Sequence, residues 1–389
     1  MNPPRVLSII IPAYNEETAI GAIIRRCLDA RPALCRETGL GSVEVVVVDD
    51  GSRDRTQAIA AGFPEVRLVA HPVNRGYGAA LASGFAAARG DLLGFLDADG
   101  TCDPRAFSDL HRVLLRESAD MAVGNRLHGS SQIPLIRRIG NRFYAFVIAR
   151  LTGVSVSDSA SGMRLFRREF LERLQPLPSG LHFTPAMTAR AASLGARIAE
   201  VPIPYAERQG RSKLNVAADG MRFLRVILGT IFAIYPLRIF GPLGALFLVV
   251  ALGYGVRPVA HYLLYRQLES EMIYRLLTIV TLCACSLTAI CFGLVAQCLS
   301  DAVTGRSTAI IRWPGLAGAA TAAGVVLGLG GILLNSRTIM EYVTSGRITT
   351  HWVYVLTGGL AVISGTVLSC FGVTLGLARH LPARAGGAR

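Results

Sequence analysis

Lysine is almost absent from this chain of 389 residues, because Lys213 is the single lysine among its 40 basic residues. Charged residues of all kinds are scarce: they make up 17% of the sequence, against about 25% in a typical soluble protein. Hydrophobic residues make up 51%. This composition excludes an intrinsically disordered protein and a wholly soluble one. It also makes the lone lysine a position of interest.

Charge is missing above all from the C-terminal part of the chain. Four uncharged runs of 18 to 31 residues lie there, and a membrane-spanning helix needs about 20 mostly apolar residues. We therefore expect an all-α membrane domain over residues 238–380, with a basic tail at 381–389. The predicted transmembrane helices are 239–256, 276–300, 313–336 and 352–378. No charged residue interrupts these runs, which argues against a proton relay or an ion pathway.

The N-terminal part lacks the features of a signal peptide. Its first apolar run, Val6–Ile11, is short and continues directly into Pro12 and polar residues. We therefore expect residues 1–215 to be a cytoplasmic domain of a multi-pass plasma-membrane protein, which also suits the arginines of the tail. Residues 216–237 are expected to form a juxtamembrane helix on the bilayer surface, or part of one long bent helix with the first span.

Several site motifs are also missing. The sequence contains no Walker motif and no G-x-G-x-x-G, so phosphate-loop hydrolases and dinucleotide enzymes lose support. The eight cysteines have no metal-ligand spacing. The formal net charge of +14 favours an anionic bilayer and phosphorylated substrates as partners, and no nucleic-acid motif accompanies it.

Two glycine pairs in the expected spans could bring helices close together. They are Gly324-x-x-x-Gly328 and Gly372-x-x-x-Gly376. The sequence leaves open whether neighbouring spans or the protomers of a homo-oligomer use them.

Strands and helices alternate along the N-terminal part, which predicts an α/β, Rossmann-like domain with a mostly parallel sheet. Ligands of such sheets bind beyond the carboxyl ends of the strands. Polar or acidic residues follow three of the expected strands, so one crevice could gather them. The expected strands are 6–11, 43–48, 66–69, 92–96 and 121–123, and the expected helices between them are 18–30, 55–61, 78–88 and 104–117.

Asp97 and Asp99 are the most informative pair in that crevice. Residues two apart on a strand share a face, and both carboxylates could reach one divalent cation. Mg²⁺ and Mn²⁺ prefer oxygen ligands and are often shared with substrate phosphates. The alternative is a turn whose aspartates cap a helix, as we expect for Asp103 before Pro104.

Taken together and in order, the motifs resemble the nucleotide-sugar domain of glycosyltransferase family two, which has the GT-A fold. The motifs are VLSIIIPAYNE at 6–16, VVVVDDGSRDRT at 45–56, NRGYGAA at 74–80 and FLDADG at 95–100. Further motifs at 124–126, 158–164 and 208–214 resemble the subgroup that includes dolichyl-phosphate mannose synthase.

The resemblance implies roles for individual residues on the donor side. Asp97 and Asp99 would bind Mg²⁺ or Mn²⁺ at the donor diphosphate, with Ala98 lining the site. Thr101 stands where the family often has a glutamine, which leaves the third metal ligand in doubt. The residues implied to hold the donor base and ribose are Pro12, Tyr14, Glu16, Val48 and Asp50.

The acceptor side can be argued from charge. Arginine forks match phosphate oxygens, and lysine supplies a compact charge. Lys213 stands out because the chain otherwise uses arginine, and it lies in the matched motif with Ser212. The predicted phosphate-binding residues are Arg126, Arg138 (or Arg137), Arg164, Arg208, Arg211, Ser212 and Lys213. Asp158 is not expected to act directly.

The segment Ile133–Leu151 reads as an amphipathic helix, with Ile136, Ile139, Phe143 and Val147 at helical spacing. It could pack on the core, or it could lie in the bilayer surface and guide a lipid to the crevice.

The predicted function is inverting transfer of a sugar from a nucleotide-sugar donor, GDP-mannose or a UDP-hexose, to a polyprenyl phosphate (dolichyl or undecaprenyl) at the cytoplasmic face. Inversion is implied by the resemblance. One alternative is a processive polysaccharide synthase of the same family. That group carries a Gln-x-x-Arg-Trp element, and here both tryptophans, Trp313 and Trp352, fall at membrane boundaries. The other is a nucleotide-binding membrane scaffold or transporter, which would not need the Asp97 and Asp99 metal site.

Overall fold

The computed structural model describes residues 5–127, 133, 135–206, 216–266, 272–304, 313 and 315–379. The chain divides into two compact units, residues 1–231 and residues 232–389, and each is described by itself.

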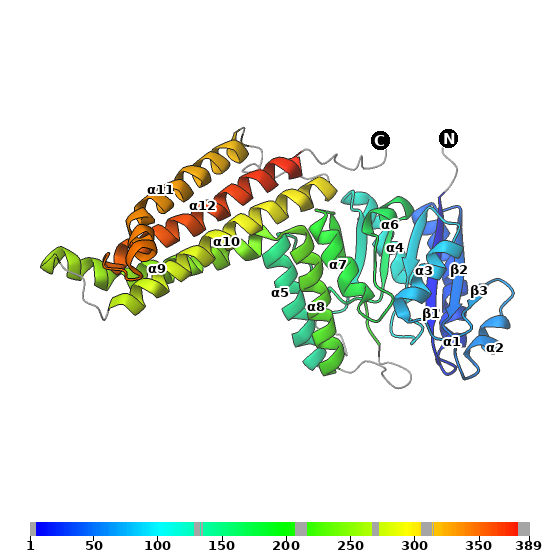
Figure 1. Ribbon diagram of the computed structural model, residues 1–389. Coiled ribbons are helices and arrows are strands. Elements are labelled where there is room, and N and C mark those ends of the chain that lie inside the picture. The colour runs from blue at the N-terminus through cyan, green and yellow to red at the C-terminus, as the bar shows by residue number, and fades with distance from the viewer. Residues whose placement is uncertain are drawn as a thin grey trace. The chain divides into compact units, whose positions relative to one another are not determined.

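A seven-stranded sheet forms the centre of the first unit, in the order β3-β2-β1-β4-β6-β5-β7 (Figure 1). Strands β3, β2, β1 and β4 run parallel, whereas β6 is antiparallel to both of its neighbours. The strands are β1 (Val6–Ala13), β2 (Ser42–Asp49), β3 (Arg67–Ala70), β4 (Leu92–Phe95), β5 (Met121–Asn125), β6 (Arg164–Arg167) and β7 (Ile198–Pro202). The predicted mostly parallel sheet is confirmed. The last two strands were not expected from the sequence.

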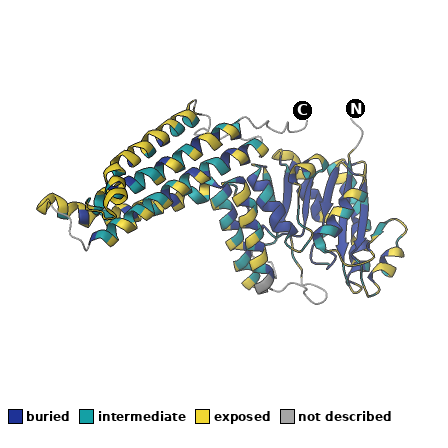
Figure 2. Ribbon diagram, viewed as in Figure 1, coloured by how far each residue is buried: buried dark blue, intermediate teal, exposed yellow. Residues whose placement is uncertain are grey.

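Helices cover both faces of this sheet. The first-unit helices are α1 (Ile20–Thr38), α2 (Thr56–Ala61), α3 (Tyr77–Ala87), the 3₁₀ turn η1 (Pro104–Ala106), α4 (Phe107–Arg116), α5 (Leu135–Thr152), α6 (Arg168–Leu174), α7 (Phe183–Ser193) and α8 (Val216–Ile234), which continues into the second unit. Strand β1 shows why two layers form, because Ile9 and Ile11 point into one core with α1 and α4. Ile10 points into the other core with α3 and α7. A strand buried on both faces reads as a continuous apolar run, and the central strands β1, β2 and β4 are accordingly almost entirely buried (Figure 2).

Four long helices make up most of the second unit, and each is long and apolar enough to cross a membrane. They are α9 (Leu237–Tyr265), α10 (Ile273–Thr304), α11 (Leu316–Ser345) and α12 (Trp352–Arg379). Most of their surface is not buried within the chain (Figure 2), as expected of helices whose apolar side chains face lipid. The prediction of an all-α membrane part with four spans is confirmed. Helix α8 ends before α9 begins, with Pro236 at the N-cap of α9, so the two are separate helices.

Glycines bring α11 and α12 into close contact. A Cβ atom on Gly324 would lie 2.5 Å from the backbone nitrogen of Ser369, and one on Gly372 would lie 2.5 Å from the carbonyl oxygen of Ala317. Small residues allow this close approach in membrane helices. Gly324 and Gly372 are therefore used between neighbouring spans of one chain.

Candidate active site

A cavity of about 600 Å³ opens at the carboxyl ends of β1, β2 and β4. The parallel register explains the convergence, because Pro12 pairs with Val48 and Ile10 pairs with Phe95 at this edge. The structure thus brings together eight residues that the sequence singled out. They are Pro12, Tyr14, Glu16, Asp50, Asp97, Ala98, Asp99 and Arg126.

The loop after β1 is fixed by the loop after β2. The backbone N–H of Asn15 donates to Ser52 Oγ (2.9 Å), and Asn15 Oδ1 accepts from the backbone N–H of Arg53 (2.8 Å). Asn15 itself has φ of 48°, a left-handed conformation that asparagine tolerates. The backbone N–H of Glu16 donates to Thr56 Oγ1 (2.8 Å). These contacts hold Tyr14 and Glu16 at the cavity wall.

Asp50 organises a third loop, the one that leads into α3. Its carboxylate accepts the backbone N–H groups of Arg75 (2.9 Å) and Gly76 (2.8 Å), and it lies 2.7 Å from His71 Nδ1. His71 Nε2 in turn lies 2.8 Å from Ser83 Oγ. Through these hydrogen bonds the buried Asp50 carboxylate fixes the loop, and the residue also lines the cavity.

Asp97 and Asp99 follow β4 and line the cavity together. Tyr77 Oη donates to Asp97 Oδ1 (2.8 Å), and Thr101 donates to Asp99 Oδ1 through its hydroxyl (2.7 Å). Burial and the nearby Asp97 charge raise the pKa of Tyr77 well above its usual value, so the phenol stays protonated and donates.

The donor set suits a hard divalent cation, since Mg²⁺ and Mn²⁺ take carboxylate oxygens and share the rest of their shell with water and substrate phosphate. Among the described residues, no group of three or more His, Cys, Asp and Glu side chains comes together. Thr101 is buried and does not line the cavity, and its hydroxyl is used by Asp99. The pair therefore fits a cation that substrate phosphates help to hold.

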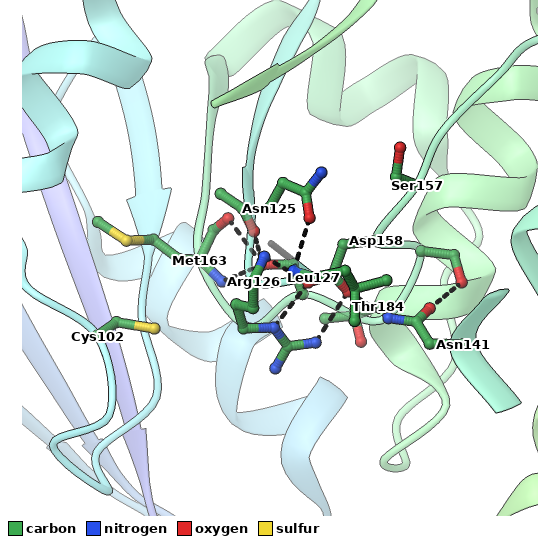
Figure 3. Close-up of polar contacts among 12 residues, drawn as sticks. Cys102, Asn125, Arg126, Leu127, Asn141, Ser157, Asp158, Met163 and Thr184 are labelled. Atoms are coloured by element: carbon green, nitrogen blue, oxygen red, sulfur yellow. Dashed lines mark hydrogen bonds and ion pairs between the residues drawn. The ribbon is translucent and has the colours of Figure 1, made fainter. Parts of the chain in front are cut away.

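Arg126 lines the cavity and forms an ion pair with Asp158 (Figure 3). Its Nε and Nη2 donate to the two carboxylate oxygens at 2.8 and 2.9 Å, and its backbone N–H donates to Oδ2 at 3.1 Å. Asn141 Nδ2 also donates to Asp158 (2.5 Å). Burial acts to raise the pKa of Asp158, but the Arg126 charge and these hydrogen bonds outweigh it and lower the pKa below its usual value. The guanidinium also lies 5.4 Å from the ring centre of Tyr205.

Arg164, predicted to bind phosphate, lies outside the cavity. It is 0% exposed, and its guanidinium donates to the carbonyl oxygens of Ser159 (2.9 Å), Ser161 (3.2 Å) and Thr184 (3.0 Å). Burial lowers its pKa to about 10. Arg164 does not line the cavity because it begins β6 and its side chain points into the core. It holds the loop of residues 159–161 in place of contacting substrate.

Two further predicted residues do not line the cavity. Val48 is fully buried in the core against α3, because side chains of β2 alternate between the two faces of a sheet covered on both sides. Arg138 on α5 is absent from the cavity wall, whereas its neighbour Arg137, the alternative that the sequence left open, lines it. Arg208, Arg211, Ser212 and Lys213 lie outside the described residues. The described positions Tyr205 and Gly220, on either side of them, both line the cavity.

The cavity wall also contains residues that sequence reasoning missed. Arg222 on α8 lines it and pairs with Asp219 (3.0 Å). Tyr77 and Tyr144 contribute hydroxyl groups, and Tyr77 lay in the matched motif at 74–80, where a signal was present. No sequence motif marks Arg222, which lies in a mostly apolar helix of a chain rich in arginine.

Helices α5 and α8 lie side by side (Figure 1), and residues of both line the cavity. Tyr144 Oη donates to the carbonyl oxygen of Gly220 (2.8 Å), and the ring of Tyr144 lies 6.2 Å from that of Phe223. On α5, Ile136, Ile139 and Phe143 are 62%, 60% and 50% exposed. The core-packing interpretation of these three side chains is therefore wrong: the apolar stripe faces outward.

The comparisons with known proteins agree with the motifs. Residues 8–175 match the sequence profile of Glycosyl transferase family 2. The chain is 34% identical over 226 residues to the low-salt glycan biosynthesis hexosyltransferase Agl6 of Haloferax volcanii, covering 57% of this chain and 53% of Agl6, about half of that relative's length.

Two other relatives are covered more fully. The dolichyl-phosphate hexose transferase of H. volcanii is 34% identical over 218 residues, which cover 55% of this chain and 89% of that protein. The undecaprenyl-phosphate 4-deoxy-4-formamido-L-arabinose transferase of Pseudomonas fluorescens is 30% identical, covering 62% of this chain and 69% of that protein.

Among solved structures, glucosyl-3-phosphoglycerate synthase from Mycobacterium tuberculosis, in complex with Mn²⁺, uridine diphosphate and phosphoglyceric acid, is similar with a TM-score of 0.48 and 25% identity. The match covers 58% of this chain and 78% of that one. The profile match and the two relatives that this chain covers by more than two thirds agree with the motifs at the strand ends. The chain therefore belongs to glycosyltransferase family 2.

Proposed function

We propose that this protein transfers a hexose from a nucleotide-sugar donor to a polyprenyl phosphate, making a lipid-linked monosaccharide at the membrane surface. One observation carries the proposal: a single cavity reaches from the Asp97 and Asp99 pair to α5 and α8, and both of these helices carry large exposed apolar side chains among their arginines. A water-soluble donor and a membrane-embedded acceptor need such a site, open to a polar crevice at one end and to lipid at the other. The printed names of two relatives, a dolichyl-phosphate and an undecaprenyl-phosphate transferase, support this acceptor class.

The donor end is the crevice beyond β1, β2 and β4. Pro12, Tyr14, Glu16 and Asp50 surround the place proposed for the base and ribose. Asp97 and Asp99 would hold Mg²⁺ or Mn²⁺ beside the diphosphate, where a divalent cation supplies positive charge to the leaving group. The proposed donor is GDP-mannose or a UDP-hexose.

The acceptor end is the part of the cavity between α5 and α8. Arg126, Arg137 and Arg222 place three guanidinium groups on its wall. Among the described residues, Arg126 Nη1 makes no hydrogen bond, because Asp158 takes only Nε and Nη2. Guanidinium forks match phosphate oxygens. The apolar residues Ile133, Ile136 and Phe223 line the same region and suit the first isoprene units.

The chemical step follows from this arrangement. An oxygen of the acceptor phosphate attacks the anomeric carbon, a new carbon–oxygen bond forms, and the bond to the donor diphosphate breaks on the opposite face. A phosphate monoester is ionised at neutral pH, so the step needs no strong general base. Arginines on the wall orient the acceptor and offset its charge. Family membership supports inversion of the anomeric centre.

Membrane topology is part of the proposal. Four spans return the C-terminus to the side of the catalytic unit, and the arginines at 384 and 389 suit the cytoplasmic side. We therefore place residues 1–215 and the donor site in the cytoplasm, with α8 at the bilayer surface. Lys213 is proposed to contact the acceptor phosphate on the basis of the sequence motif.

A donor and acceptor screen tests the proposed reaction. Membranes containing the protein would be incubated with radiolabelled UDP- and GDP-hexoses, with and without added dolichyl or undecaprenyl phosphate, and the products extracted into organic solvent. We expect labelled lipid from at least one donor, increasing with added acceptor. Labelled polymer in place of labelled lipid would support the polysaccharide synthase, and no transfer from any donor would contradict the proposal.

A further inference from the structure

Asp97 is contacted on one side by the hydroxyl group of a tyrosine. Tyr77 is the first residue of α3, and its Oη donates to Asp97 Oδ1 at 2.8 Å. The two residues come from different strand ends, since Tyr77 follows the loop after β3 and Asp97 follows β4. Both line the cavity.

The backbone around Tyr77 is held tightly. Gly76 has φ of 99°, and a Cβ atom on Gly78 would lie 2.1 Å from the carbonyl oxygen of Pro178. Only glycine fits at such positions. The N–H groups of Arg75 and Gly76 are bound by Asp50. These contacts fix the backbone at the start of α3, and with it the place from which the Tyr77 hydroxyl reaches Asp97.

Asp97 is confined from a second direction by the loop before β6. A Cβ atom on Gly162 would lie 2.0 Å from Asp97 Oδ2, so the carboxylate lies directly against backbone. The loop is itself fixed, because Ser161 Oγ donates to the carbonyl oxygen of Gly124 (2.6 Å) and Arg164 holds the carbonyl of Ser159 (2.9 Å). The Asp97 carboxylate thus lies between a tyrosine hydroxyl and a glycine.

We propose that Tyr77 is a positioning residue for the divalent cation: its hydroxyl sets the orientation of the Asp97 carboxylate before the cation binds. The inference rests on the proposed function, in which Asp97 is a metal ligand. Outer hydrogen-bond partners of metal ligands reduce the freedom that a ligand loses on binding, and their removal typically weakens metal affinity by about 10- to 100-fold. With Thr101 committed to Asp99, each of the two carboxylates has its own hydroxyl partner.

A positioning role for the Tyr77 hydroxyl can be distinguished from a purely structural role of the Tyr77 ring. The ring packs against the core that contains α3 and α7, and Tyr77→Phe keeps the ring while removing only the hydroxyl. If the residue matters only for packing, Tyr77→Phe leaves metal affinity unchanged. If the hydroxyl orients the carboxylate, metal affinity falls while the fold remains intact.

The test is direct binding of Mn²⁺ to the purified full chain in detergent, measured by the electron paramagnetic resonance signal of free Mn²⁺, with Mn²⁺ alone and with UDP or GDP present. We expect Tyr77→Phe to raise the Mn²⁺ dissociation constant about ten-fold. Tyr144→Phe is the matched control, because that hydroxyl also lines the cavity but donates to the carbonyl of Gly220; its Mn²⁺ affinity should equal that of the wild type. Thermal unfolding of both variants verifies that the fold is retained.

The outcomes separate this inference from the proposed function. Wild-type Mn²⁺ affinity in Tyr77→Phe, together with lost binding in Asp97→Asn, would overturn the positioning role and leave the metal site standing. A wild-type chain that binds no Mn²⁺ under any of these conditions would overturn both. A ten-fold loss in Tyr77→Phe without any lipid product from the wild type would support the positioning role and contradict the proposed transfer.

Discussion

The guanidinium of Arg126 and the carboxylate of Asp158 meet through two parallel hydrogen bonds of 2.8 and 2.9 Å, and Asp158 is completely buried. The pair fixes the one arginine that faces the cavity from the end of β5. Asp158 thus holds the Arg126 side chain in position.

Replacing Asp158 should destabilise the catalytic unit. Asp158→Asn leaves the Arg126 charge buried without its partner, which costs about 3–5 kcal/mol. Denaturant unfolding at pH 7 measures the free energy of unfolding. Because the folded-state pKa of Asp158 is depressed, its contribution is present above the unfolded pKa of about 3.9 and is lost as the pH falls further. The difference between wild type and variant should therefore shrink below about pH 4. If the difference in the free energy of unfolding stayed constant from pH 7 to pH 3, the ionised Asp158 carboxylate would not be the stabilising partner of Arg126.

Arg137 and Arg164 should give opposite phenotypes. Arg137→Ala removes a cavity-lining cation and should raise the KM for polyprenyl phosphate about ten-fold, since a hydrogen bond to a charged group contributes about 1.5–3 kcal/mol. Its melting temperature should hardly change. Arg164→Met leaves buried carbonyl groups without donors, at about 1–3 kcal/mol each, and should lower the melting temperature markedly. Steady-state kinetics and thermal unfolding of both variants provide the comparison; an Arg164→Met protein of wild-type stability would show that the buried contacts do not hold the loop.

The exposed apolar face of α5 should matter for long lipids. Ile139→Glu and Phe146→Glu alter residues that are exposed and do not line the cavity. We expect transfer to a long-chain polyprenyl phosphate to fall by about five-fold or more, because a charge weakens insertion of an amphipathic helix into the interface. Transfer to a short, water-soluble isoprenyl phosphate should change little. Leu115→Glu on α4 is the control, since Leu115 is also an exposed apolar residue; an equal loss in all three variants would argue against a membrane face on α5.

Close packing of α11 and α12 can be tested with two glycines of one helix. Gly324→Ala places a methyl group 2.5 Å from the Ser369 backbone nitrogen, whereas nothing lies within 4 Å of a Cβ on Gly330. Overpacking typically costs about 1–3 kcal/mol. Gly324→Ala should therefore lower the thermal stability of the membrane unit in detergent, while Gly330→Ala should leave it unchanged or slightly increased. Equal stabilities would mean that the helices do not pack through Gly324.

The sequence was most informative where the fold follows from periodicity. Parallel strands buried on both faces are continuous apolar runs, and the polar residues after them had to meet at one sheet edge, as Asp50, Asp97 and Asp99 do. The four spans followed from the length of the uncharged runs.

Side-chain direction could not be predicted in the same way. Arg164 lies in a matched motif, yet the motif does not reveal that it begins an antiparallel strand and points inward. Strand β6 has two apolar residues between arginines, too few for a strand signal. The spacing of Ile136, Ile139 and Phe143 is the same for a core-facing and an outward-facing helix, so only the packing of α5 distinguishes the two.

The most direct test of the account is sugar transfer by the purified full chain, reconstituted in vesicles with polyprenyl phosphate and supplied with a labelled nucleotide sugar, with and without Mn²⁺. Wild-type protein should form organic-extractable labelled lipid that requires both the acceptor phosphate and the cation. Asp99→Asn should fold normally and form none. Equal transfer by Asp99→Asn, or by the wild type without the acceptor phosphate or after removal of divalent cations, would contradict the account.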